Sequence, residues 1–550
     1  MKKLLLSVLI ISSTIFINKA VAQLSQGGTP FSFTVDSKHL PTIAYQTMPS
    51  FDLAALKAED AVNDLSKGPF RFGFNHYVSL NPANSGTWTT LPNGDRLWQL
   101  GIKSPGALTL NLAFDDFYLP KTASLFVYNS TKDFVIGAFT DADNQKDKAF
   151  ATDLIPGEAI ILEYYEPAAV ANQGRMNLFR VTHGYRGVED YATNFTEKSF
   201  GQAGSCQVNI NCPFGAGWQN EKHAVVCLVS GGSEFCSGAL VNDVPQDGKP
   251  YILTANHCGS SGFSTWVFRF NWEAPGCTNP GTSPSTSQSL SGGTQLASSA
   301  NSDFSLVEIT GGLAGGTVPA SYNPYFAGWS NVDVPADSAW GIHHPSGDIK
   351  KISHAANACI SGTWSGTPAD SHWQIGLWTT ACTEPGSSGS PLFDQNHRVV
   401  GQLHGGPSAC GNTGSNMIDY YGKFSMSWLG GGTNTTQLKV WLDPNNTGAT
   451  TLNGWGPTMG VSEKPASVSS FSIYPNPSNG EFNMDVNLNS LQNVVIKIFN
   501  VVGEVVLQKT ISNITSGNYS IDLTNQAKGI YFADVSTTTE HSVKKIVVVE

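Results

Sequence analysis

The feature that most constrains this chain is the placement of its cysteines. All nine lie between Cys206 and Cys410, and the rest of the 550-residue sequence contains none. Cysteines gathered in one segment are typical of a domain that folds in an oxidising compartment and is cross-linked there. The sequence therefore predicts one disulfide-stabilised domain with cysteine-free regions on both sides.

The first 22 residues indicate how the chain reaches such a compartment. A basic start at Lys2 precedes an apolar run over 4–17 and the small residues 20–22. This order is typical of a secretory signal peptide. The alternative is a membrane anchor, but a run of about 14 residues is shorter than the roughly 20 needed to span hydrocarbon.

Composition restricts the fold class and the partners. Charged residues make up 13% of the chain, and 56 glycines accompany 11% aromatic residues. This balance favours a mainly β, turn-rich protein over long charged helices. The net charge of −11 argues against a nucleic-acid partner, because such a binder needs clustered Lys and Arg to neutralise phosphates.

The length predicts several domains, at roughly 100–200 residues each. Residues 23–200 contain strand-like runs between turn signals, and 201–456 hold all the cysteines and several Gly/Ser-rich loops. The Pro- and Ser-containing stretch 457–470 lacks apolar periodicity and is interpreted as a linker. Residues 471–550 alternate strands and turns over a length that suits a small β-sandwich.

Three polar residues of the middle segment point to nucleophilic catalysis. His257 ends an apolar run beside Cys258, which suits a general base held in one orientation. Ser388 lies in a glycine-containing turn that can present a nucleophile and outward-facing N–H groups. Asp303 begins an apolar strand, and burying its carboxylate requires a partner such as His257.

Each of these signals is weak alone, because a serine turn is often an ordinary loop and an Asp before a strand is often a turn residue. Their order along the chain, His, Asp and Ser, is one of the known orders of the serine-protease triad. The alternative is a set of buried polar residues in an inactive relative.

Longer strings carry a family resemblance. Thr254-Ala255-Asn256-His257-Cys258 and Gly386-Ser387-Ser388-Gly389-Ser390-Pro391 resemble the signatures of trypsin-like serine proteases. The wider match, from about Gly201 to Gly456, resembles bacterial lysyl endopeptidase. The most specific strings are Gly201–Cys206, Glu384–Pro391, Gly401–Ser408 and Trp441–Pro444.

The resemblance implies a trypsin-like double β-barrel with His257 as base, Asp303 as its orienting partner and Ser388 as nucleophile. The backbone N–H groups of Gly386 and Ser388 would form the oxyanion hole. Asp419 would lie at the base of the specificity pocket and pair with a substrate lysine. Without the resemblance, Asp419 would be interpreted as a loop carboxylate.

Two further positions follow from the resemblance. In lysyl endopeptidases an aromatic residue and a histidine stack beside the catalytic histidine, and the matching positions are Trp364 and His404. The match at Trp364 requires a one-residue gap, so a loop-anchoring aromatic is the alternative there. Trypsin has an Asp before the nucleophile that captures the new N-terminus, whereas this chain has Ser387, so that ion pair is not expected.

The family pattern also implies the disulfides Cys206–Cys410, Cys212–Cys277 and Cys236–Cys258. Cys359 and Cys382 depart from that pattern and are expected to form an added bridge, which leaves Cys227 as a buried thiol. A zinc site is the alternative for these cysteines, but the sequence contains no C-x-x-C pair. We therefore expect neither a metal nor a cofactor.

The two ends receive separate interpretations. The tail resembles the C-terminal sorting domain of type IX secretion cargo, with a carbohydrate-binding or adhesive sandwich as the alternative. Residues 23–200 are interpreted as a propeptide from their position, with an independent binding domain as the alternative. The strings that carry the tail resemblance are Phe471–Pro477, Ile496–Asn500, Gly529–Phe532 and Val543–Val548.

The sequence thus predicts a monomeric serine endopeptidase, exported across the outer membrane, that acylates Ser388 and cleaves protein and peptide substrates after lysine. The type IX secretion machinery would be its other partner. The alternatives are a trypsin-like protease that accepts Lys and Arg equally, and a surface adhesin on an inactive protease scaffold. Self-cleavage after Lys198 would give a mature start at Ser199, whereas the family match places it at Gly201.

Overall fold

The computed structural model describes residues 27–34, 40–66, 68–188, 203–281, 283–456, 470–500, 504–536 and 541–549. The predicted signal peptide, the junction around Lys198 and all but the end of the predicted linker lie outside these residues. The chain divides into two units, Met1–Pro457 and Thr458–Glu550, which are described separately. Within the described ranges, no helix is both long and apolar enough to cross a membrane.

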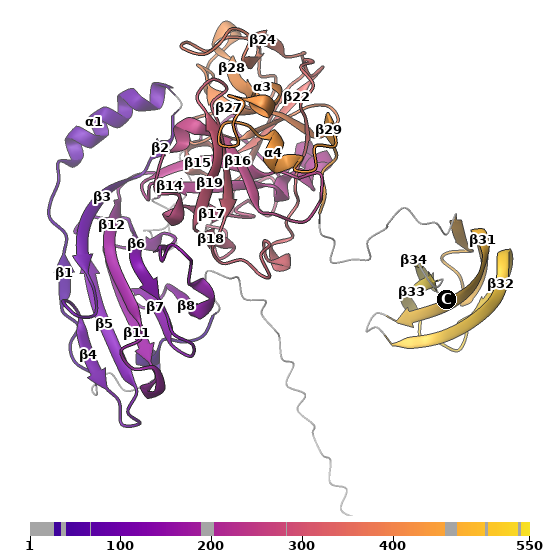
Figure 1. Cartoon of the computed structure of the whole chain (residues 1–550), viewed down its shortest axis with the longest axis horizontal. Coiled ribbons are helices and arrows are strands. Elements are labelled where there is room, and N and C mark those ends of the chain that lie inside the picture. Colours follow the sequence, from indigo (N-terminus) through magenta and orange to yellow (C-terminus); the bar gives the residue numbers. More distant parts are fainter. Residues whose placement is uncertain are drawn as a thin grey trace, which may run out of the picture. The chain divides into compact units, whose positions relative to one another are not determined.

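The N-terminal part of the first unit contains two β-sheets and the helix α1 (Leu53–Asn63) (Figure 1). Asp52 caps the N-terminus of this helix, because its carboxylate accepts a hydrogen bond from the Ala55 N–H at 2.9 Å. One sheet has the order β1-β5-β11-β7-β8, with β4 on β5: β1 (Tyr45–Thr47), β4 (Thr87–Thr90), β5 (Arg96–Lys103), β7 (Ser124–Asn129), β8 (Val135–Phe139), β11 (Ala159–Glu166). The other has the order β10-β6-β12-β3, with β9 on β6: β3 (Gly73–Leu80), β6 (Thr109–Tyr118), β9 (Phe150–Ala151), β10 (Ile155–Pro156), β12 (Arg175–Gly184).

The protease part of the first unit contains two further sheets, as expected for a double β-barrel. The first has the order β18-β17-β14-β15-β16-β20-β19: β14 (Val225–Ser230), β15 (Glu234–Leu240), β16 (Tyr251–Ala255), β17 (Val267–Arg269), β18 (Ser289–Ser291), β19 (Gly293–Ser299), β20 (Phe304–Ile309). The second has the order β13-β23-β22-β26-β27-β28-β25-β24, with β21 on β27 and β29 on β21: β13 (Val208–Asn209), β21 (Gly328–Ser330), β22 (Ala339–His343), β23 (Lys351–Ala355), β24 (Ile360–Gly362), β25 (His372–Ile375), β26 (Pro391–Phe393), β27 (Arg398–Gly405), β28 (Asp419–Lys423), β29 (Thr451–Leu452). Two short helices follow the last long strand: α3 (Phe424–Leu429) and α4 (Lys439–Leu442).

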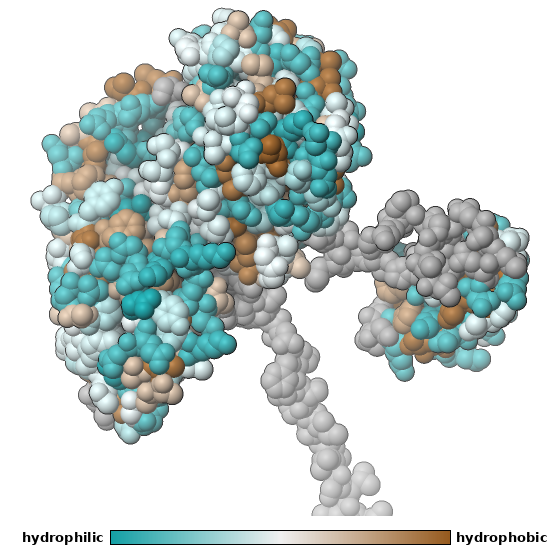
Figure 2. Space-filling model, in the orientation of Figure 1, coloured by the Kyte–Doolittle hydropathy of each residue, from teal (hydrophilic) through white to brown (hydrophobic). Residues whose placement is uncertain are grey.

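The N-terminal region and the protease share one hydrophobic core. A single cluster of buried side chains includes Phe72 and Val181 from the N-terminal region together with Phe235 and Val267 from the first protease sheet and Trp272, which follows β17. In Figure 2 the visible face of this unit is mostly hydrophilic, with hydrophobic residues scattered over it, so the apolar side chains are concentrated inside.

The contact between the two parts is also polar and hydrogen-bonded. Strand β2 (Phe70–Arg71) from the N-terminal region pairs antiparallel with β15. The carboxylate of Asp153 forms a buried ion pair with Arg269, whose side chain is inaccessible to solvent, and accepts a hydrogen bond from Ser289 at 3.0 Å. The N-terminal region is therefore packed against and hydrogen-bonded to the protease part of the first unit.

The second unit is a curled β-sheet with its own core. Strand β31 pairs with β30, β32 and β33, and its register with β32 shifts between Asn487 and Gln492. Buried residues from both halves of β31, including Phe482 and Ile496, belong to one cluster, which matches the small β domain that the sequence predicts. The strands are β30 (Ser470–Tyr474), β31 (Glu481–Asn500), β32 (Val505–Asp522), β33 (Gly529–Ser536) and β34 (His541–Val548).

The disulfides agree with the family pattern but not with the added bridge. Cys206–Cys410, Cys212–Cys277 and Cys236–Cys258 are formed. The bridge expected between Cys359 and Cys382 is not formed, and both are buried thiols, as is Cys227. The reason is the direction of the Cys382 side chain, whose Sγ lies 3.7 Å from Sγ of Cys206, beside the bridge to Cys410.

Candidate active site

The histidine and aspartate of the predicted triad lie at the ends of two paired strands. Strand β16 leads into the short turn Asn256–Cys258, and β20 begins directly after Asp303. His257 Nδ1 lies 2.6 Å from Asp303 Oδ2, and the His257 backbone N–H donates to Asp303 Oδ1 at 3.0 Å. Two contacts to one carboxylate and the Cys236–Cys258 disulfide fix both the position and the tautomer of this imidazole.

Ser388 lies in a tight turn that only glycine permits at two positions. Gly386 and Gly389 have φ values of +88° and +80°, and a Cβ on Gly389 would lie 2.1 Å from Thr254 Oγ1. The Ser388 carbonyl accepts a hydrogen bond from the Ser237 N–H at 2.8 Å, which ties the turn to the first protease sheet. The turn therefore joins the two barrels beside His257.

The reactive nitrogen of the histidine is not engaged elsewhere. Nε2 of His257 is buried and makes no hydrogen bond within the described part of the chain. Catalytic hydrogen bonds to a nucleophile are often long before substrate binds and tighten in the complex. The arrangement of His257 suits a general base that faces the groove.

The predicted oxyanion hole is occupied by the chain itself. The N–H of Gly386 donates to the backbone carbonyl oxygen of Gly68, at 3.3 Å. Gly68 belongs to the N-terminal region, 318 positions earlier in the sequence by subtraction of the two residue numbers. A donor that the family pattern assigns to the oxyanion thus holds a carbonyl oxygen in this structure.

Asp419 is fully buried at the start of β28 and is surrounded by donors. Its Oδ2 accepts hydrogen bonds from Trp378 Nε1 at 2.7 Å, Thr383 Oγ1 at 2.7 Å and Ser408 Oγ at 2.6 Å. A Cβ on Gly406 would lie 2.4 Å from the other oxygen, Oδ1, so the close approach of residue 406 to this side of the carboxylate requires glycine.

Sequence reasoning missed the three donors to Asp419. Trp378 and Thr383 come from the connection between β25 and β26 and Ser408 from the loop after β27, and only the fold brings them together around Asp419. Ser408 ends one of the strings that carry the family resemblance, which was the only signal for it.

Trp364, His404 and His257 form a stack. The ring centroids of Trp364 and His404 lie 4.4 Å apart, and those of His404 and His257 lie 5.5 Å apart. The structure thus brings together Trp364, His404 and His257, as the resemblance implies. Trp364 lies in the stacked position although its match required a one-residue gap. Burial lowers the pKa of His404 to about 4, so its ring is neutral at neutral pH.

A second missed residue orients this stack. His372 Nε2 lies 2.9 Å from His404 Nδ1, and its own Nδ1 lies 2.8 Å from Ser371 Oγ. Burial lowers the pKa of His372 to about 4. Nothing in the sequence around His372 distinguishes it from a core histidine, because its partner lies on a different strand.

The residue before Ser388 has an internal partner. Ser387 Oγ lies 2.8 Å from His343 Nδ1, and His343 Nε2 lies 2.8 Å from Ser353 Oγ. The start of the protease domain is instead bound by Glu384, which accepts a hydrogen bond from the Gly204 N–H at 3.0 Å. The turn is thus held by neutral hydrogen bonds where trypsin uses an ion pair.

Among the described residues, two groups of side chains have ligand atoms close enough to hold a cation. In the first, Cys206, Cys382 and Cys410, two members form a disulfide. In the second, single ligand atoms of His257, Asp303 and His404 lie within 4.8 Å of one another. These atoms already hold the imidazole of His257 against its carboxylate. A cation at this position would therefore compete with the hydrogen bond that orients the proposed base.

The chain is similar to known proteases and to a known export domain. A family model described as the C-terminal domain of lysyl endopeptidase matches residues 200–422. A model described as a secretion system C-terminal sorting domain matches residues 472–549. A lysyl endopeptidase of Pseudomonas aeruginosa is 28% identical over 360 residues, which cover 62% of this chain and 75% of that protein.

Among solved structures, the crystal structure of a thermostable serine protease from an extremophilic microorganism aligns with 37% of this chain and 91% of its own. That alignment has 15% sequence identity and a TM-score of 0.25.

The fold, the family match and the Pseudomonas relative together define a serine endopeptidase. Residues 200–422 are similar to the C-terminal domain of lysyl endopeptidase, and the sorting domain matched at 472–549 marks the protein for export across the outer membrane.

Proposed function

We propose that this protein hydrolyses peptide bonds on the carboxyl side of lysine through an acyl-enzyme on Ser388. His257 Nε2 takes the proton of the Ser388 hydroxyl as its oxygen attacks the carbonyl carbon, while Asp303 stabilises the imidazolium that forms. The N–H groups of Gly386 and Ser388 bind the oxyanion. His257 then protonates the leaving amine, and water releases the acyl group by the reverse sequence.

The observation that carries the lysine preference is the buried carboxylate of Asp419, whose Oδ1 side lies against Gly406. A substrate cation that reaches this carboxylate forms an ion pair with it, which an apolar side chain cannot do. A lysine ammonium is a compact point charge, whereas the arginine guanidinium is a wide planar fork that needs more room. Because Asp419 attracts either cation, equal use of Lys and Arg is the alternative.

The domain limits belong to the same proposal. We infer a signal peptide at 1–22, a propeptide at 23–200, the protease at 201–456, a linker at 457–470 and the sorting domain at 471–550. The enzyme works as a monomer and releases itself by cutting after Lys198, with trimming to Gly201 as the alternative route. The shared core of the N-terminal region and the protease supports a propeptide that folds with its enzyme.

The nucleophile is tested by Ser388→Ala, with Ser390→Ala in the same turn as the matched control. Ser388→Ala is expected to abolish hydrolysis of lysyl peptides and labelling by a fluorophosphonate while the circular dichroism spectrum stays the same. Ser390→Ala should retain both activities. If the Ser388→Ala protein kept a tenth of the wild-type rate, the nucleophile would be misassigned. If the wild type showed no labelling, the result would favour the alternative of a surface adhesin on an inactive protease scaffold.

The specificity is tested with matched Lys and Arg peptides on Asp419→Asn and on the exposed control Asp337→Asn. Asp419→Asn should reduce kcat/KM for the Lys peptide by orders of magnitude and scarcely change the weak rates on apolar peptides. Asp337→Asn should behave as the wild type does. Equal wild-type rates on the Lys and Arg peptides would reduce the proposal to a general trypsin-like specificity.

A further inference from the structure

The starting observation is that Gly68 places its carbonyl oxygen on the N–H of Gly386, at 3.3 Å. A substrate places the carbonyl of its scissile bond on this donor. The side chain of Phe70, two residues later, is close to the same turn, since a Cβ on Gly386 would lie 3.3 Å from the Phe70 Cβ. The segment from Gly68 onward thus begins where a substrate would be attacked.

The segment then follows the edge of a protease strand. Phe70 pairs with Phe235 and Arg71 pairs with Glu234, in antiparallel register with β15. The Phe72 N–H continues the pairing by donating to the Ser233 carbonyl at 2.8 Å. Residues after a scissile carbonyl form the leaving group, so β15 holds Phe70 and Arg71 on the leaving-group side of the active site.

We propose that Gly68–Arg71 is an inhibitory segment that binds the protease as a substrate does but is not cut. This inference rests on the proposed function, and it assigns the leaving-group side of the groove to the edge of β15. A substrate would add a strand at the same edge once the N-terminal region has left.

Two features of the sequence explain why the Gly68–Pro69 bond would survive. Gly68 has no side chain that can reach Asp419, so the pocket gives no binding energy to this position. The nitrogen of Pro69 is a tertiary amide with a ring carbon where other residues have hydrogen. That ring hinders the approach of His257 to the leaving nitrogen. Lys67, a residue that the enzyme would accept, lies outside the described residues.

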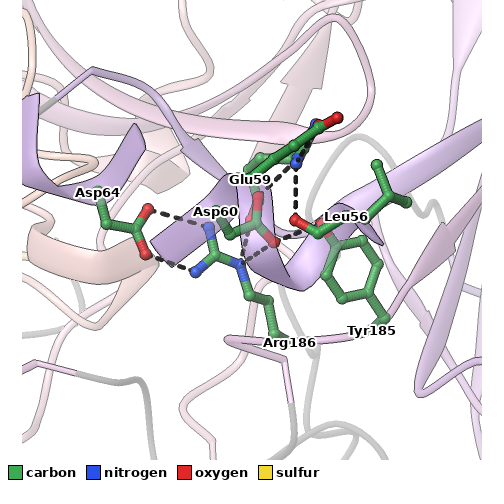
Figure 3. A network of polar contacts seen from close by, with 7 residues as sticks. Leu56, Glu59, Asp60, Asp64, Tyr185 and Arg186 are labelled. Atoms are coloured by element: carbon green, nitrogen blue, oxygen red, sulfur yellow. Dashed lines mark hydrogen bonds and ion pairs between the residues drawn. The ribbon is translucent and has the colours of Figure 1, made fainter. Parts of the chain in front are cut away.

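A buried network holds the inhibitory segment in place (Figure 3). Asp60 of α1 is 2% exposed and accepts hydrogen bonds from Arg71 Nε at 2.7 Å and from Tyr185 Oη at 2.7 Å. Arg186 lies 3.1 Å from the same carboxylate and binds Asp64 at 2.6 Å. The helix, β2 and the end of β12 are therefore fixed together, and the register of Gly68 on the oxyanion hole follows from this network.

The first test uses precursors that keep the N-terminal region because Lys198→Gln blocks the proposed self-release. Fluorophosphonate labelling of Ser388 in this precursor should be at least 100-fold slower than in the mature enzyme. Adding Asp60→Asn or Phe70→Ala should speed labelling at least tenfold, because the segment loses its anchor or its strand contact. Phe74→Ala, which removes an aromatic ring from β3 that stacks on Phe51, should stay within twofold of the Lys198→Gln precursor.

The second test converts the inhibitor into a substrate within the full chain. The double variant Gly68→Lys with Pro69→Ala should be cut between positions 68 and 69, as found by intact-mass spectrometry. Each single variant should stay intact at that bond, and the cut should vanish when Ser388→Ala is added. No cut in the double variant, or a precursor labelling rate that Asp60→Asn and Phe70→Ala leave unchanged, overturns the inference.

Measurements on the mature enzyme test the proposed function separately from the inhibitory segment. Mature enzyme from the same preparations must label and cleave lysyl peptides, whatever the inhibitory segment does. A cut between Lys67 and Gly68 in the Lys198→Gln precursor would support a lysine-specific enzyme and contradict the register of the inhibitory segment. Failure of the mature enzyme itself would instead overturn the proposed function.

Discussion

The N-terminal region and the C-terminal unit look alike in the sequence but differ in their relation to the protease. Both lack cysteine and both are built from β-strands. The N-terminal sheets share a hydrophobic cluster and a strand pairing with the first protease sheet. The C-terminal unit buries its own cluster, around residues such as Phe482 and Ile496.

Because of this difference, the N-terminal region and the C-terminal unit suit different tasks. A region that shares a core with its neighbour affects the folding and the accessibility of that neighbour, because its removal exposes apolar surface to water. A unit with its own core can be recognised, exported and removed without disturbing the rest. The first arrangement suits control of the active site, and the second suits an export signal.

The largest expected effect is on folding. A chain that lacks residues 23–200 should yield at least 100-fold less lysyl peptidase activity than the full chain after equal expression, because Phe235, Val267 and Trp272 lose the partners of their shared cluster. A chain that lacks residues 471–550 should give the full yield. Equal yields from the two truncations would show that the N-terminal region is as separable as the tail.

The next effect concerns the buried ion pair between the two parts of the first unit. Asp153→Ala, in a Ser388→Ala background that prevents processing, should lower the free energy of unfolding by about 3–5 kcal/mol, because Arg269 stays buried without its carboxylate. Urea denaturation measures this loss. The matched control is Glu158→Ala, which breaks an exposed pair with Lys103 and should cost about 0–1 kcal/mol.

These effects concern contacts that the sequence does not reveal. The cysteine boundaries and the His257, Asp303 and Ser388 strings predicted the class of enzyme and its division along the chain. The pairing of β2 with β15 joins residues more than 160 positions apart, and no local pattern specifies it. The donors to Asp419 come from two loops that are apart in the sequence, so no local pattern specifies them either.

The error at Cys359 and Cys382 has a similar origin. The two cysteines flank the Trp364 loop, and their spacing suggested a bridge. A disulfide requires the side chains to point at each other, and sequence spacing carries no information on direction. In the fold, Cys382 points toward Cys206, so spacing alone led to the wrong pair.

A smaller expected effect is the pH dependence of the stability of the N-terminal region. His183 is 3% exposed, lies 2.7 Å from Ser104 Oγ through Nδ1, and has its pKa lowered to about 4 by burial and by neighbouring His76. The unfolded histidine has a pKa of about 6.5, so the unfolded chain takes up the proton first as pH falls. Stability from neutral burial is complete above about pH 6.5 and is lost as pH falls toward 4.

The precursor should therefore be less stable at pH 4.5 than at pH 7.5, with about 1 kcal/mol of the difference due to His183 after allowance for solvent screening. His183→Gln should reduce the pH dependence by this amount. Urea titrations of the wild type and the variant at the two pH values measure this change. An identical pH dependence in His183→Gln and the wild type would contradict the assignment.

The smallest expected effect is that of the tail on the protease, and it tests the independence of the second unit. Ile496→Ala removes a fully buried side chain from the tail cluster and should cost that unit about 2–5 kcal/mol. Because the described residues of this cluster all belong to the second unit, calorimetry of the full chain should show one transition lowered and the other unmoved. The kcat/KM for a lysyl peptide should stay within twofold of the wild type. A matched lowering of both transitions would mean that the two units unfold together. Both flanking regions would then contribute to the stability of the enzyme, and the N-terminal region and the tail would differ only in degree.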